Sequence, residues 1–176
     1  MKKTMLCILL IAVAFTTSVA QKNNISISNN NGEIRISVQD SKQKLDLKLK
    51  GEITFTDDEK GIQSLSNDGT VSFKKDGDKL KITQETNGTL LYVINGKKKL
   101  VLDEKDKALV AQCVQTMIAI GVNGKERAQK IYETTGFESV LKEVNRFESD
   151  YVKHTYLNVL GSSDSLSESE MLSFLE

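Results

Sequence analysis

The chain lacks several residue types that mark common functions. Its 176 residues include no proline or tryptophan, and one histidine, His154. Lysine and arginine together number 24, as do aspartate and glutamate, so the formal net charge is zero. A nucleic-acid-binding protein needs a clear basic excess, so we expect no nucleic-acid partner. One histidine is also too few for a histidine-based zinc centre.

The first twenty residues have the three-part layout of a secretory signal peptide. Lys2 and Lys3 form a basic start, an apolar run covers 5–15, and small side chains stand at Ser18 and Ala20. This layout predicts export to the periplasm or the medium, with cleavage after Ala20. After it, no apolar run approaches the roughly 18–20 residues that span a bilayer, so we expect no membrane span in the mature chain.

Cysteine is scarce as well. Cys7 lies inside the predicted signal peptide, which leaves Cys113 as the one cysteine of the mature chain. No internal disulfide can then form, so the fold must depend on its hydrophobic core. Cys113 stands among apolar residues at helical spacing, which favours a buried small side chain. The alternative is a hydrolase that uses Cys113 or His154, although the two are far apart in sequence.

Residues 21–102 predict an antiparallel β-meander of about eight strands. Apolar and polar residues alternate there, for example at Leu45, Leu47 and Leu49, so each strand has one apolar and one polar face. Turn-forming pairs separate the runs: Asn31-Gly32, Asp68-Gly69, Asp76-Gly77, Asn87-Gly88 and Asn95-Gly96. The segment 90–94 is apolar on both faces, so we expect a central strand with helices over its second face.

Residues 103–176 predict four or five short helices packed on or beside the sheet. Asp103 and Ser149 are suitable N-caps, and Asn123 with Glu126 matches a capping box. A further helix is expected to begin at Ser165. The fold class is therefore α+β, with a signal peptide over 1–20, the meander over 21–102 and the helical region over 103–176.

Two charged segments are the candidate contact surface. One is Asp57, Asp58, Glu59 and Lys60, which could bind calcium weakly but lacks the regular spacing of a calcium loop, and a charged hairpin turn explains it without any ion. The other is Lys97, Lys98 and Lys99, expected at the tip and edge of a hairpin. We predict no catalytic residues, no metal site and no cofactor.

Several segments resemble a known group of proteins. They are 51–58 (GEITFTDD), 61–66 (GIQSLS), 90–96 (LLYVING), 125–128 (KERA), 140–144 (VLKEV) and 148–151 (ESDY). Together they resemble uncharacterised exported proteins of Bacteroidota, related to ectodomains found with BlaR/MecR-type sensor peptidases. The resemblance covers roughly 51–160 and implies an extracytoplasmic interaction or sensing module. The zinc motif His-Glu-x-x-His does not occur in the chain, so the resemblance implies no peptidase activity.

These observations lead to one expected function and, besides the hydrolase named above, two alternatives. We expect a non-enzymatic module that binds another extracytoplasmic protein, through surface complementarity or strand addition at an open sheet edge. One alternative is a regulatory partner of an envelope sensor system. The other is a carrier of a small apolar ligand held between the sheet and the helices.

Overall fold

The computed structural model describes residues 24–30, 33–39 and 44–162. The predicted signal peptide and the predicted helix at Ser165 lie outside these ranges. The strands are β1 (Asn24–Asn30), β2 (Glu33–Gln39), β3 (Lys44–Lys50), β4 (Ile53–Phe55), β5 (Ile62–Leu65), β6 (Thr70–Lys75), β7 (Asp78–Gln84), β8 (Leu90–Ile94) and β9 (Lys97–Lys99). The helices are α1 (Glu104–Ala119), α2 (Gly124–Thr135), α3 (Phe137–Val144) and α4 (Asp150–Gly161). The α+β prediction, an antiparallel meander followed by helices, is confirmed.

Seven strands form the main sheet, in the order β1-β2-β3-β6-β7-β8-β9, and all neighbours are antiparallel. Strands β4 and β5 leave this sheet and form a separate two-stranded hairpin, so β3 pairs directly with β6. Period-two alternation reports the face of a strand but not its neighbour. The sequence therefore did not predict that this hairpin would separate from the meander.

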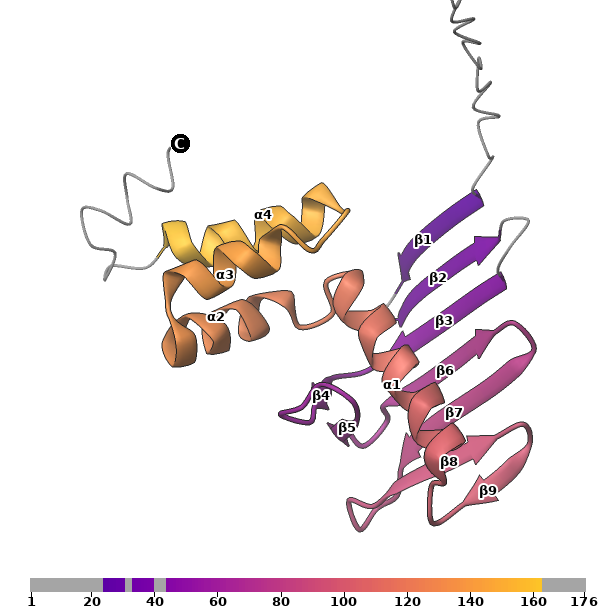
Figure 1. The fold of residues 1–176 in the computed structure, drawn as a ribbon. Coiled ribbons are helices and arrows are strands. Elements are labelled where there is room, and N and C mark those ends of the chain that lie inside the picture. Colours follow the sequence, from indigo (N-terminus) through magenta and orange to yellow (C-terminus); the bar gives the residue numbers. More distant parts are fainter. Residues whose placement is uncertain (1–23, 31–32, 40–43, 163–176) are drawn as a thin grey trace, which may run out of the picture.

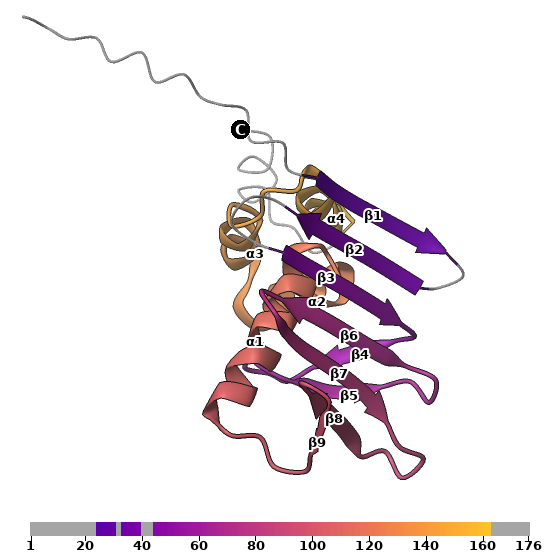
Figure 2. The same ribbon diagram turned by 90° about the vertical axis from the view of Figure 1, so that its right-hand side faces the viewer.

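One face of the main sheet is buried. Its apolar side chains alternate along the strands, as Leu47, Phe73 and Ile82 do, and these three have no exposed surface. Helix α1 crosses this face (Figure 1), and its buried side chains include Cys113 and Met117. Figure 2 shows the helices and the β4–β5 hairpin on this same side of the sheet. None of the described helices lies on the other face of the sheet, which we call the open face.

Strand β8 is not central, so that prediction was wrong. It is the next-to-last strand and lies between β7 and the three-residue β9. Ile94 is buried, whereas Leu91 and Val93 are half-buried. The register places Leu91 opposite Thr83 and Val93 opposite Lys81, so both lie on the open face. Among the described helices, none therefore covers the second apolar face of β8.

The helix boundaries follow local chemistry. Asp103 caps α1 by accepting a 2.9 Å hydrogen bond from the backbone N–H of Asp106, and the backbone N–H of Asp103 donates to the Asp106 carboxylate at 3.3 Å. Gly136, at φ 85°, separates α2 from α3 in a left-handed conformation that glycine adopts without strain. Ser149 caps α4 as predicted. None of the described helices has the length and apolar character needed to cross a membrane.

Candidate functional site

The turn between β4 and β5 is built by its own side chains. The hydroxyl of Thr56 donates to Oδ1 of Asp58 (2.6 Å) and accepts from the backbone N–H of Gly61 (2.9 Å). Oδ1 of Asp58 also accepts from the backbone N–H of Lys60 (3.1 Å). The bonds from Thr56 and Lys60 hold the pKa of Asp58 below its ordinary value. Asp58 therefore shapes the turn, and Glu59 is held at a left-handed φ of 54°.

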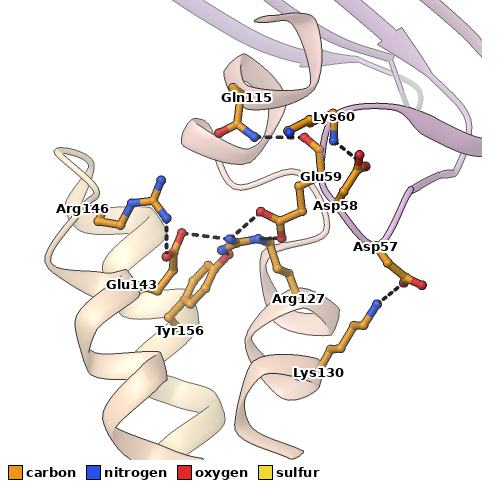
Figure 3. Close-up of polar contacts among 10 residues, drawn as sticks. All are labelled: Asp57, Asp58, Glu59, Lys60, Gln115, Arg127, Lys130, Glu143, Arg146 and Tyr156. Atoms are coloured by element: carbon orange, nitrogen blue, oxygen red, sulfur yellow. Dashed lines mark hydrogen bonds and ion pairs between the residues drawn. The ribbon is translucent and has the colours of Figure 1, made fainter. Parts of the chain in front are cut away.

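Arg127 of α2 binds this turn to the helices, as Figure 3 shows. Its Nε lies 2.5 Å from Oε1 of Glu59, and its Nη2 lies 2.9 Å from Oε2 of the same carboxylate. Nη1 donates to the Tyr156 hydroxyl at 2.7 Å. Burial alone would lower the pKa of Arg127, but the hydrogen bonds to Glu59 and Tyr156 raise it above its ordinary value. The guanidinium therefore remains charged.

Glu143 of α3 joins a second arginine to the network. Its Oε1 lies 2.9 Å from Nη2 of Arg127, and its Oε2 lies 2.7 Å from Nη1 of Arg146. The side chains of Arg127 and Glu143 are only 10% and 11% exposed, so their charges are largely removed from water. Two arginines and two glutamates balance, which is the condition under which ionised groups tolerate burial.

Tyr156 of α4 is fully buried beneath Arg127. Its ring packs against Phe147, with ring centroids 4.9 Å apart. Burial raises the pKa of Tyr156 above its ordinary value, although the bond from Arg127 acts in the opposite direction. The hydroxyl remains neutral and accepts the hydrogen bond from Arg127, so its chemical role is to satisfy the buried guanidinium.

Two amide side chains add contacts to the same hairpin. Nε2 of Gln115 on α1 donates to the backbone carbonyl of Glu59 at 3.0 Å, and Nδ2 of Asn123 donates to the carbonyl of Ile53. Asn123 stands at the N-cap of α2 with a left-handed φ of 54° and makes no capping bond. The predicted capping box of Asn123 with Glu126 is therefore wrong, because the Asn123 amide is directed to the hairpin.

A groove of about 400 Å³ lies beside this network. We call it the hairpin–helix groove. Residues that line it include Thr54 and Phe55 from β4, and Glu126, Lys130, Ile131 and Thr134 from α2. Lys130 forms an exposed ion pair with Asp57 of the turn, at 2.6 Å. The lining thus offers both signs of charge, hydroxyl groups and a small apolar area.

The structure separates the two predicted contact segments. In Figure 1, β9 with Lys97–Lys99 and the β4–β5 hairpin lie on opposite sides of α1. Lys99 is partly buried and lies 2.8 Å from Asp106 and 3.6 Å from Asp103; the bond to Asp106 raises the pKa of Lys99. Lys60, Lys97 and Lys98 are exposed. Glu59 and Lys99 therefore hold elements together, and their exposed neighbours are the groups that can meet a partner.

Cys113 and His154 are not brought together. The Cys113 thiol is fully buried in the core, and burial raises its pKa to about 12. His154 is exposed on α4, where its Nδ1 lies 3.0 Å from Nδ2 of Asn158. Within the described ranges, no hydrogen bond joins the two residues. A thiol with a raised pKa is a poor nucleophile at neutral pH.

The described residues contain no group of three or more histidine, cysteine, aspartate or glutamate side chains that could hold a metal ion. The carboxylates of the turn instead have partners within the protein. Asp57 pairs with Lys130, Asp58 with Thr56, and Glu59 with Arg127.

Comparisons with protein families, with curated proteins and with solved structures found no match to this chain.

Sequence reasoning identified the turn but missed Arg127, Glu143 and Tyr156. Glu59 and Arg127 are 68 residues apart, and periodicity does not report such pairs. A compositional clue existed, because the chain has three arginines, Arg35, Arg127 and Arg146, among 24 basic residues. Arginine is always charged and can form a bidentate pair with a carboxylate, which lysine cannot do. A rare arginine in a lysine-rich chain was therefore a reason to expect a specific ion pair.

Proposed function

We propose that this protein is a non-enzymatic interaction or sensing module that works outside the cytoplasm and binds another protein at the hairpin–helix groove. The observation that supports the proposal is the rigid attachment of the β4–β5 turn, through Glu59 and Arg127, to the helix that forms the other wall of the groove. A surface with fixed geometry loses little conformational entropy when it binds. The predicted signal peptide supports the compartment.

The chemistry of the site also favours binding over catalysis. The buried groups of the network are satisfied by one another: Glu59 and Glu143 by arginines, and Tyr156 by Arg127. A general base or nucleophile would need a free, reachable group with a tuned pKa. The groove is instead lined by Lys130, Asp57 and Glu126 together with Phe55 and Ile131. Mixed polar and apolar lining of this kind suits recognition of a polypeptide.

A carrier function has less support. A ligand held between the sheet and the helices would have to displace core side chains such as Phe73 and Met117, both fully buried. Displacing a packed aromatic or aliphatic side chain forfeits roughly 1.5–3 kcal/mol of burial for each one.

A substitution that blocks the groove tests this proposed function. Thr134 is exposed on α2 and lines the groove, so Thr134→Arg places a long charged side chain there. Thr86→Arg makes the same change at an exposed site between β7 and β8. The wild-type protein and T86R should capture the same protein from an extract of the producing cells, and T134R should lose it. Equal capture by both variants would contradict the groove as the binding site.

A further inference from the structure

The open face of the main sheet carries a cluster of unpaired lysines. Side chains alternate between faces along each strand, so the neighbours of the buried residues point away from the helices. Six exposed lysines lie on this face, and we call them the basic face: Lys44, Lys48, Lys74, Lys79, Lys81 and Lys98. Within the described part of the chain, none of the six forms an ion pair through its side chain.

Strand register brings these lysines close together. Lys74 of β6 stands directly opposite Lys79 of β7. Ser72 of β6 separates Lys48 of β3 from Lys81 of β7 along one row across the sheet. Like charges directly opposite in a sheet destabilise it. Positive charge is thus concentrated on one face of a chain with zero net charge, and repulsion between these lysines lowers the stability of the fold.

Few negative charges offset the basic face. Among the described residues, the strands place the carboxylates of Glu33 and Asp46 on this face, with Asp46 directly opposite Lys74. Asp76 and Asp78 line a hollow together with Lys44, Lys74 and Lys79. The carboxylate of Glu33 forms an ion pair with Arg35 at 2.6 Å. The bond from Arg35 lowers the pKa of Glu33, with smaller contributions from Lys48 and Lys50. Lys48, Lys81 and Lys98 do not line that hollow and are exposed, so the complement of their positive charge is an anionic surface.

Two exposed apolar residues follow β9, the edge strand that carries Lys98. Leu100 and Val101, which follow β9, are 95% and 84% exposed, the two highest values among the large apolar side chains described. Lys98 precedes this pair by two residues, and its neighbour across the sheet is Val93, half-buried on the open face. Adjacent exposed aliphatic residues beside lysines are typical of protein segments that lie in the interface of an anionic membrane.

We propose that the basic face docks on an anionic lipid bilayer, with its lysines near the headgroups and Leu100-Val101 entering the interface. Protein interfaces are enriched in aromatic residues and arginine and depleted in lysine, the reverse of this surface. Single-stranded nucleic acids stack on aromatic side chains, and Tyr92 of β8 lies on the opposite, helix-covered face. The proposal goes beyond the hairpin–helix groove and does not depend on it.

The test measures partitioning onto phosphatidylcholine vesicles with and without phosphatidylglycerol. The full chain is used as recovered from the producing cells, and every variant has the same N-terminus. Wild-type protein should bind the anionic vesicles, and raising the salt from about 0.1 to 1 M should release it, because salt screens exposed charges. Lys48→Gln with Lys81→Gln should weaken binding by about fivefold for each lysine. Leu100→Ser with Val101→Ser should also weaken it.

The matched control neutralises Lys125 and Lys142, which are exposed on α2 and α3. K125Q/K142Q has the same net charge as K48Q/K81Q, and its binding should stay within about twofold of wild type. Three results would overturn the proposal: no binding to anionic vesicles, equal weakening by the two double variants, or tighter binding to poly-glutamate or to an oligonucleotide than to vesicles. Circular dichroism should show both double variants folded, since all four lysines are exposed and unpaired.

Discussion

Arg127→Met tests whether the buried ion network holds the β4–β5 hairpin to the helices. The change removes all four nitrogen–oxygen contacts of the guanidinium, to Glu59, Tyr156 and Glu143, while methionine keeps part of the apolar stem. Glu59 then loses its cation. Glu143 keeps Arg146, yet remains 11% exposed.

The expected loss of unfolding free energy follows from these contacts. Removing one partner of a buried ion pair costs about 3–5 kcal/mol, because the other charge stays buried without compensation. Glu59 is 32% exposed and can recover some hydration. We therefore expect R127M to lose about 2–4 kcal/mol of unfolding free energy, which for a domain of this size lowers the melting temperature by roughly 5–15 °C. Urea unfolding monitored by circular dichroism measures this loss.

A double-mutant cycle with Glu59→Gln assigns the loss to the pair. Coupling between directly contacting residues usually lies between about 0.5 and 3 kcal/mol, and we expect the upper half of that range for Arg127 and Glu59. Lys130→Met is the matched control, because it removes the exposed ion pair with Asp57 on the same helix and should cost at most about 1 kcal/mol. If R127M unfolds at the same urea concentration as K130M, the network does not hold the hairpin.

Two further predictions concern single groups. Asp103→Ala should lower the melting temperature, because it removes the cap of α1. The hydrogen bond from the backbone of Asp106 lowers the pKa of Asp103, so this stabilisation should be present near neutral pH and disappear as the pH falls through the folded-state pKa. Equal melting temperatures of D103A and wild type at pH 7 would refute the cap. Cys113 should resist an aromatic disulfide reagent in the native state and react fully in urea. Its contribution to unfolding free energy should fall as the pH rises from the ordinary thiol pKa of 9.0 towards its folded-state pKa of about 12. Fast labelling of the native protein would show that the thiol is accessible.

Much of the fold could be predicted because its causes are local. Alternation at Leu45, Leu47 and Leu49 fixes which face of β3 is buried, and Asp103 supplies a cap from its own side chain. Tertiary contacts overrode local preference at Asn123, whose amide binds the distant carbonyl of Ile53 and makes no capping bond. The two-sided apolar character of β8 predicted burial on both faces, but its place beside β9 decided its environment.

The candidate site was predictable only in part. The charged turn around Asp58 was visible as a cluster, yet the partner of Glu59 lies 68 residues away on α2. The basic face, too, could be predicted from the sequence only in part. The run Lys44-Leu45-Asp46-Leu47-Lys48 reveals one charged face of β3, but only the pairing of β3 with the non-consecutive strand β6 places Lys48 in one row with Lys81 of β7. Spacing within one strand contains no information about register with the next.

The proposed function requires that another protein binds in the hairpin–helix groove. A photo-crosslinking amino acid placed at Thr134, within the groove, and separately at Thr86, outside it, tests this directly in the producing cells. We expect one defined protein adduct from position 134 and none from position 86. Irradiation that gives no adduct from position 134, or the same adduct from both positions, would contradict it.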